Sequence, residues 1–208
     1  MNDDQTFRSF LIAGSAILFP ILAYYRLRSQ ATRERLDRRQ EGWFILLSLR
    51  PMGMAGMLSL FAFMIDPGWM VWSSMRLPAW LRWCGAGLWV PGGLLLVWTL
   101  RTLGTNLTDT VVTRRDHKLV TRGPYLWIRH PFYVSAALLF LASSLLAANW
   151  FVIACGMLTF TLLTIRVERE EERLLWRFGE AYRDYRERTG RFVPRVGGPT
   201  SPWNPRSG

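Results

Sequence analysis

Long apolar runs separated by clusters of arginine dominate the chain. Runs over residues 10–25, 43–65 and 81–100 have the length and composition of membrane crossings. A further run over 132–165 is too long for one crossing, and residues 147–150 offer a natural turn that leaves two halves near the lower length limit. The pattern therefore predicts an all-α integral membrane protein of five transmembrane helices, the last two forming a tight hairpin.

The segment after the last apolar run predicts a carboxyl-terminal amphipathic helix. Its apolar face comprises Val167, Leu174, Phe178, Ala181 and Tyr185. At about 100° per residue, Glu170 and Glu171 flank this face and Glu172 points away. Carboxylates beside a buried stripe are costly unless a cationic group meets them. Arg129, another loop arginine or a positively charged ligand would serve.

Basic residues are distributed unevenly about the predicted spans. Five crossings put all but four of the 26 basic residues on one side, the exceptions being Arg8, Arg50, Arg76 and Arg82. The positive-inside rule then places the amino terminus outside and the carboxyl terminus in the cytoplasm, at the inner membrane if the protein is bacterial. Tryptophans at both expected interfaces support this count, with Trp69, Trp72, Trp80, Trp83 and Trp150 outside and Trp43 and Trp98 inside.

Composition narrows the class of protein further. The 208 residues carry a net charge of +11, yet half of them are hydrophobic. Basic domains that bind nucleic acid do not contain long apolar runs, so we expect no nucleic-acid partner and assign the charge to topology and to anionic lipids. Cys84 and Cys155 lie within apolar runs, which makes them small core residues and not a disulfide framework or a metal site. The oligomeric state is left open.

The loop over 101–129 is long for a plain connection, and long ordered loops tend to be functional. Pro131 at a first helical position starts a helix well, which puts Arg129 and His130 at the membrane surface, at the amino-terminal mouth of the fourth span. Backbone N–H groups, the helix dipole and a guanidinium make an anion site there. Contact with lipid phosphates is the simpler interpretation.

An arginine inside the second span is a second candidate. Arg50 lies about 10 Å deep, counted from Trp43 at 1.5 Å per residue. A charged side chain at that depth indicates a functional site, here a contact with substrate. The competing interpretation is that the side chain extends to the inner interface.

Residues 117–194 resemble the carboxyl-terminal half of the isoprenylcysteine carboxyl methyltransferase family and the related phospholipid N-methyltransferases. The shared pattern is His-x-Leu-Val-x-x-Gly-Pro-Tyr, Arg-His-Pro-x-Tyr, an apolar hairpin, Glu-Glu, then Phe-Gly-x-x-Tyr-x-x-Tyr and a closing Pro. In this chain the matching residues are His117, Leu119, Val120, Gly123, Pro124, Tyr125, Arg129, His130, Pro131, Tyr133, Glu170, Glu171, Phe178, Gly179, Tyr182, Tyr185 and Pro194. Ser135 stands where many members have a glycine, and we expect this small residue to be tolerated.

The resemblance implies a membrane methyltransferase that uses S-adenosylmethionine, yields S-adenosylhomocysteine and needs no metal. It implies catalytic roles for Arg129, His130 and Tyr133. It implies cofactor contacts from His117, Leu119, Val120, Gly123, Tyr125, Arg129, His130, Pro131, Tyr133, Glu170 and Glu171. In this arrangement Arg129 pairs with the cofactor carboxylate, and Glu170 or Glu171 takes its ammonium group.

The same resemblance divides the chain into three parts. Residues 1–100 form the acceptor side, residues 101–195 form the cofactor-binding core, and residues 196–208, rich in Gly and Pro, are expected to be a mobile tail. The partners implied are membrane lipids and a lipophilic methyl acceptor.

The acceptor and two other classes of protein stay open. A prenylcysteine-type carboxylate, a phosphatidylethanolamine amine, or a small hydrophobic thiol or acid would each fit. An NADPH-dependent membrane reductase of the sterol type shares a similar Arg-His-Pro-x-Tyr segment, but those enzymes are longer and carry Trp where Tyr182 stands. The other class is a non-catalytic relative. This interpretation is less favoured because the chain keeps the full set of charged site residues, Arg129, Glu170 and Glu171.

Overall fold

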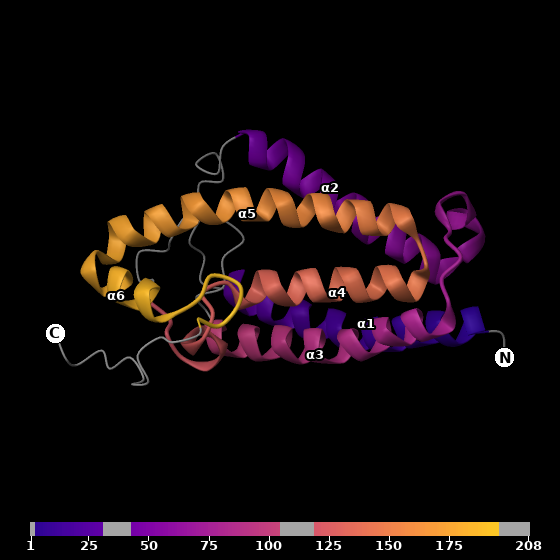
Figure 1. Cartoon of the computed structure of the whole chain (residues 1–208), viewed down its shortest axis with the longest axis horizontal. Coiled ribbons are helices and arrows are strands. Elements are labelled where there is room, and N and C mark those ends of the chain that lie inside the picture. Colours follow the sequence, from indigo (N-terminus) through magenta and orange to yellow (C-terminus); the bar gives the residue numbers. More distant parts are fainter. Residues whose placement is uncertain (1–2, 31–42, 105–118, 196–208) are drawn as a thin grey trace.

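The computed structural model describes residues 3–30, 43–104 and 119–195, which form a bundle of long helices (Figure 1). The elements are α1 (Asp3–Gln30), α2 (Trp43–Ile65), η2 (Pro67–Ser73), α3 (Ala79–Leu103), η4 (Gly123–Leu126), α4 (Pro131–Ala147), α5 (Trp150–Phe178) and α6 (Glu180–Arg188). Helices α1, α3, α4 and α5 run along the long axis, and α2 crosses α5 (Figure 1). The start of α1 and the short α6 lie at opposite ends of the bundle.

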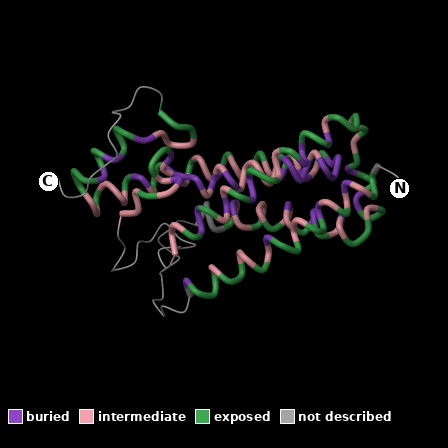
Figure 2. The backbone as a smooth tube through the Cα atoms, turned by 90° about the horizontal axis from the view of Figure 1, so that it is seen from below, coloured by how far each residue is buried: buried purple, intermediate pink, exposed green. Residues whose placement is uncertain are grey.

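The helical, membrane-embedded architecture predicted from the apolar runs is confirmed. Helices α1, α2, α3 and α5 are long and apolar enough to cross a membrane. Helix α4 has 17 residues, which is about 25 Å of helix and less than the roughly 30 Å of a hydrocarbon core. A fifth crossing by α4 therefore stays a prediction. Exposed positions occur along the whole bundle (Figure 2), and many are large and apolar, as a surface in contact with lipid requires.

Close packing of α3 on α4 fixes the middle of the bundle. A Cβ atom at Gly85 of α3 would lie 2.9 Å from the carbonyl oxygen of Ala142 in α4. One at Gly92 would lie 3.2 Å from the Cβ atom of Leu138. Small residues let two membrane helices approach closely where no hydrophobic effect drives them together. This contact holds α4, and therefore its amino-terminal residues, in a fixed place.

The predicted turn between the last two apolar helices is confirmed. Ala148 adopts the left-handed conformation with φ 47°, and the side chain of Asn149 accepts a hydrogen bond of 3.1 Å from the backbone of Val152. The amide of Asn149 also donates to Ser73 over 2.8 Å, which ties the turn to η2. Trp72 and Trp150, both predicted at the outer interface, consequently meet with ring centroids 5.7 Å apart.

Arginines close the end of the bundle where α1 begins. Arg82 is buried, donates to the carbonyl of Leu146 at the end of α4 over 2.8 Å and pairs with Asp4 of α1. Arg8 donates to the carbonyl oxygens of Met64 and Ile65, the last residues of α2. Two of the arginines that break the charge asymmetry therefore satisfy carbonyl groups at helix ends.

The expectation of a separate amphipathic helix after the fifth apolar run is wrong in its boundary. Helix α5 continues without a break from Trp150 to Phe178, because the charged segment over residues 166–178 contains no glycine or proline to end the helix. It ends at Gly179, whose φ of 53° turns the chain and resets the helical phase. Ala181 is exposed as a result, and Tyr182 is buried in its place.

Candidate active site

A buried carboxylate forms the centre of the candidate site. The side chain of Glu171 on α5 is 4% exposed, and one of its oxygens, Oε1, lies 2.9 Å from Arg129 Nε. The same oxygen lies 3.2 Å from His130 Nε2, and Oε2 lies 3.1 Å from a terminal nitrogen of Arg191. A buried carboxylate is stable only with such partners, so these three side chains keep Glu171 ionised.

Arg129 joins this carboxylate to the end of α6. One of its terminal nitrogens donates to the carbonyl oxygen of Arg186 over 3.0 Å and also to that of Thr189. A guanidinium at a helix carboxyl terminus satisfies carbonyl groups that have no partner within the helix and interacts favourably with the helix dipole. Arg129 therefore binds α5 and α6 together at the start of α4.

The backbone after α6 holds Arg129 and His130 in place. We call residues 189–195 the closing segment. The amide of Arg129 donates to the carbonyl of Gly190 over 2.9 Å, and that of His130 donates to Arg191 over 3.1 Å. A Cβ atom at Gly190 would lie 1.6 Å from the carbonyl oxygen of Val193, so only glycine fits this position. The motif residues are thus fixed through their backbone as well as through their side chains.

Tyr133 and Glu170 form a second pair next to Glu171. The hydroxyl of Tyr133 donates to Glu170 Oε2 over 2.8 Å. The ring of His130 lies parallel to that of Tyr133, with centroids 5.5 Å apart, and Phe192 of the closing segment packs on His130 at 5.9 Å. Ser135 is fully buried and donates to the carbonyl of Phe132, so a small side chain fits this position as expected.

The turn at η4 packs beside this cluster. Gly123 has φ 61°, and a Cβ atom there would lie 2.5 Å from Thr102 Oγ1 at the end of α3, which explains the glycine. The hydroxyl of Tyr185 on α6 donates to the carbonyl of Tyr125 over 2.8 Å. Burial raises the pKa of Tyr185 above its ordinary value near 10, so this phenol is a neutral donor.

The structure brings most of the predicted site residues together. Arg129, His130, Tyr133, Glu170 and Glu171 converge at one end of the bundle, with Pro131 at the first position of α4. The alternatives for the partner of Glu171 are resolved in favour of Arg129. Arg129 and Glu171, which were predicted to bind the carboxylate and the ammonium group of the cofactor, therefore pair with each other in this structure.

Four further predicted residues are not among the side chains that meet at this cluster in the described part of the chain. Leu119 and Val120 are half-buried just before η4, and His117 lies outside the described residues. Arg50 is half-buried on α2, and its neighbour Leu49 packs against Leu162 of α5. Contact of Arg50 with a substrate stays a prediction.

Of the closing segment, sequence reasoning identified Pro194 and missed the residues that contact the cluster. Arg191, Phe192 and Thr189 all contact the central cluster, yet none belongs to the pattern that identified the other residues. Arg191 is one of many arginines after α5, and no spacing distinguishes it. The glycine at position 190, two residues after the end of the short charged helix α6, was the available signal for a tight turn.

Fold and site together define an integral membrane helical protein with a buried ion-pair centre at one end. Residues 85–176 match the isoprenylcysteine carboxyl methyltransferase (ICMT) family, which confirms the resemblance. The chain is also similar to a solved structure described as the eukaryotic intramembrane Ras methyltransferase ICMT. The identity is 25%, the TM-score is 0.52, and the match covers 72% of this chain and 53% of that one.

The sequence relatives include methyltransferases and one protein of another name. A protein-S-isoprenylcysteine O-methyltransferase of Dictyostelium discoideum is 29% identical over 77% of this chain and 68% of its own length. That of Tribolium castaneum is 31% identical over 57% and 43%. The cobalt-zinc-cadmium resistance protein CzcN of Cupriavidus metallidurans is 34% identical over 55% of each chain. The chain is thus a relative of methyltransferases and spans less than half of the length of some of them.

The buried position of Glu171 predicts a large difference between adjacent acidic residues. Replacing Glu171 by Ala leaves Arg129 without its buried counter-ion, and we expect a loss of about 3–5 kcal/mol in the free energy of unfolding. Replacing the exposed Glu172 by Ala should change it by less than about 0.5 kcal/mol. Thermal unfolding of both variants in detergent measures the difference, and equal losses would contradict the structural role of Glu171.

Proposed function

We propose that the chain is a membrane methyltransferase that transfers a methyl group from S-adenosylmethionine to a lipophilic acceptor, a prenylcysteine-type carboxylate in the first place. The observation that carries this proposal is an apolar cavity that ends next to the buried ion-pair cluster. A polar centre next to a cavity lined by apolar side chains suits an acceptor with a long apolar tail and a polar reacting end.

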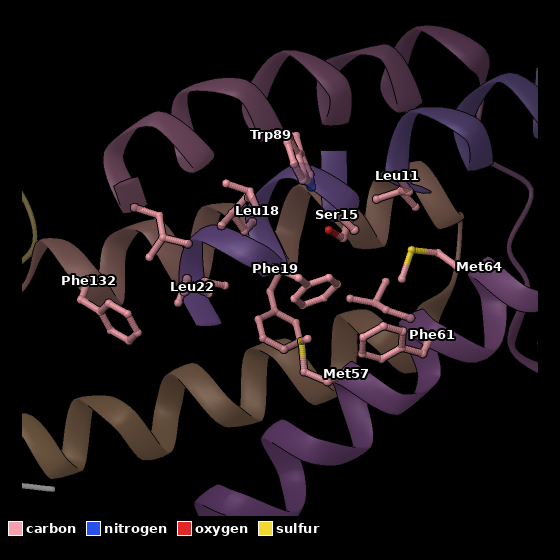
Figure 3. A pocket seen from close by; sticks show the side chains of 16 residues that line it. Leu11, Ser15, Leu18, Phe19, Leu22, Met57, Phe61, Met64, Trp89 and Phe132 are labelled. Carbon is pink, nitrogen blue, oxygen red and sulfur yellow. The ribbon is translucent and has the colours of Figure 1, made fainter. Parts of the chain in front are cut away.

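The cavity has a volume of about 250 Å³ and lies among α1, α2, α3 and α4 (Figure 3). Its lining extends from Met64 in the last turn of α2 to Phe132 in the first turn of α4. Ser15 and Ser143 are the polar side chains among the residues that line it. The ring of Phe132 lies 6.1 Å from that of Tyr133, so this end of the cavity adjoins the polar cluster.

The size of the cavity favours one class of acceptor. Pockets for drug-sized molecules measure roughly 300–1,000 Å³. A cavity of about 250 Å³ suits one slim apolar chain better than the two acyl chains of a phospholipid. This supports a prenylcysteine-type acceptor over phosphatidylethanolamine, whose N-methylation is the alternative reaction. A reductase that uses NADPH and a non-catalytic relative are less favoured.

The charged groups of the cluster fit the amino acid end of the cofactor. That end carries a carboxylate and an ammonium group, and Arg129 and Glu171 place a cation and an anion side by side, 2.9 Å apart. Glu170, which accepts from Tyr133, offers a second carboxylate for the ammonium group. Residues 119–125 and His117 would contact the adenosine. When bound, the cofactor supplies an electrophilic methyl group on a sulfonium.

The chain's own residues would act by position and by exclusion of water. A carboxylate acceptor needs no base, so holding it in line with the methyl group provides much of the rate. Attack by an anion on a sulfonium neutralises charge, and a site with little water favours that change. Arg129, His130 and Tyr133 would surround the reacting groups. An amine or thiol acceptor would need to lose a proton, for which His130 or a glutamate is the candidate base.

The proposal also assigns regions and orientation. Residues 1–100 would provide most of the acceptor side, 101–195 the cofactor core, and α4 would be the fifth crossing. Helices α1 to α4 all contribute to the cavity, so α4 belongs to both sides. The distribution of arginines supports an amino terminus outside and a site in the cytoplasm.

Binding of the reaction product tests the class of enzyme. We expect S-adenosylhomocysteine to bind the detergent-purified chain with micromolar affinity in calorimetry, and NADPH not to bind. Arg129→Ala and Glu170→Gln should each weaken binding at least about tenfold, because each removes a charge that pairs with the amino acid end. Arg188→Ala, at the exposed end of α6, is the control and should bind like the wild type. Binding of NADPH alone would favour the reductase.

Filling the cavity tests the acceptor. Ser15 lines the cavity, whereas Ala13, two residues earlier on α1, is exposed. With N-acetyl-farnesylcysteine as acceptor in lipid nanodiscs, Ser15→Phe should raise the acceptor KM about tenfold and leave S-adenosylhomocysteine binding unchanged. Ala13→Phe should match the wild type. Labelled methyl transfer to phosphatidylethanolamine in place of the prenylcysteine would support the alternative reaction.

Labelling of single cysteines tests the orientation. In a variant with Cys84 and Cys155 replaced by Ser, we expect a membrane-impermeant maleimide on intact cells to label Gln5→Cys and not Arg188→Cys. Both parent positions are exposed, so access and not burial decides the result. Labelling of position 188 alone would show that the orientation is the opposite of the proposed one.

A further inference from the structure

Tyr182 carries a buried hydroxyl group that the ion-pair cluster does not use. Its side chain on α6 is 1% exposed and is the largest fully buried side chain among the described residues. Within residues 3–30, 43–104 and 119–195, its oxygen has no hydrogen-bond partner. A buried donor without an acceptor is destabilising, so such a group in a site calls for an explanation.

Tyr182 lies on the same short helix that Arg129 contacts. Tyr182 lies one helical turn before Arg186, whose carbonyl oxygen accepts a hydrogen bond from the Arg129 guanidinium over 3.0 Å. Burial raises the pKa of Tyr182 above its ordinary value near 10, with the negative charge of Glu171 adding to the effect. Tyr182 is thus a neutral donor on which the charges of both residues of the central pair act.

Neighbouring groups do not supply the missing acceptor. The two oxygens of Glu171 already accept from Arg129, His130 and Arg191. Tyr185, whose ring centroid is 6.0 Å from that of Tyr182, directs its own hydroxyl to the carbonyl of Tyr125. A buried neutral donor that feels the charges of Glu171 and Arg129, and that has no acceptor among the described residues, fits an anionic ligand group.

We propose that the Tyr182 hydroxyl donates a hydrogen bond to the carboxylate of the cofactor's amino acid end, alongside Arg129. This inference rests on the proposed function and adds a residue to it. Tyr182 would then recognise one end of the cofactor and contribute nothing to the adenosine end. A ligand that keeps the adenosine and lacks the amino acid would not depend on Tyr182.

Two ligands and two matched variants test this. S-adenosylhomocysteine and 5′-methylthioadenosine, which lacks the amino acid end, are titrated into the wild-type chain, Tyr182→Phe and Tyr185→Phe. Tyr182→Phe should raise the Kd for S-adenosylhomocysteine about tenfold or more, because a hydrogen bond to a charged group is lost. Its Kd for 5′-methylthioadenosine should stay within about twofold, and its thermal midpoint without ligand should not fall, because the hydroxyl has no partner to lose.

Tyr185→Phe is the matched control. It removes a hydrogen bond that the structure contains, so its thermal midpoint without ligand should fall, and any change in Kd should be alike for both ligands. A selective loss of S-adenosylhomocysteine binding in this variant as well would show that the effect is not specific to Tyr182 and would overturn the inference.

The outcomes separate the two proposals. If the wild type binds S-adenosylhomocysteine and Tyr182→Phe binds it equally well, the inference about Tyr182 is wrong and the proposed function stands. Equal weakening of both ligands would assign Tyr182 a packing role and would also overturn the inference. If the wild type binds neither ligand, the proposed function fails and this inference fails with it.

Discussion

The burial of a single carboxylate, Glu171, organises the functional end of this protein. Taking a charge out of water is costly, and the cost is offset only when several donors converge on it with good geometry. Here Arg129, His130 and Arg191 provide those donors from two segments far apart in the sequence. Satisfying Glu171 therefore requires the start of α4, the end of α5 and the closing segment to meet.

The polar cluster around Glu171 lies next to an apolar helical bundle. The bundle packs through small residues such as Gly85, which suits helices surrounded by lipid, and its cavity is almost wholly apolar. The ion-pair cluster is polar and lies where α4 begins. Phe132 and Tyr133 are consecutive residues that face the cavity and the cluster respectively. In the proposed function, this arrangement would let an acceptor with an apolar tail reach the charged centre along an apolar surface.

Local features of the sequence predicted much of the fold. The bounds of α2 agree with the apolar run over 43–65, and the Ala148 and Asn149 turn lies where the long run had to divide. Proline at position 131 predicted the start of α4. The predicted boundary after the fifth apolar run was wrong, because α5 changes from apolar to amphipathic along its length with no helix-breaking residue between the two parts. Gly179, which ends it, also shifted the buried face from Ala181 to Tyr182.

By itself, therefore, the sequence determined the apolar helices, their caps and turns, the asymmetry of charge and the residue types of the site, because each depends on neighbours along the chain. Tertiary structure alone decided that Arg129 is the partner of Glu171, that Arg191 completes the set, and that the Tyr182 hydroxyl is left without a partner among the described residues. It also created the cavity, from four helices. These features depend on which distant groups share a buried volume, and no periodicity in one segment encodes that.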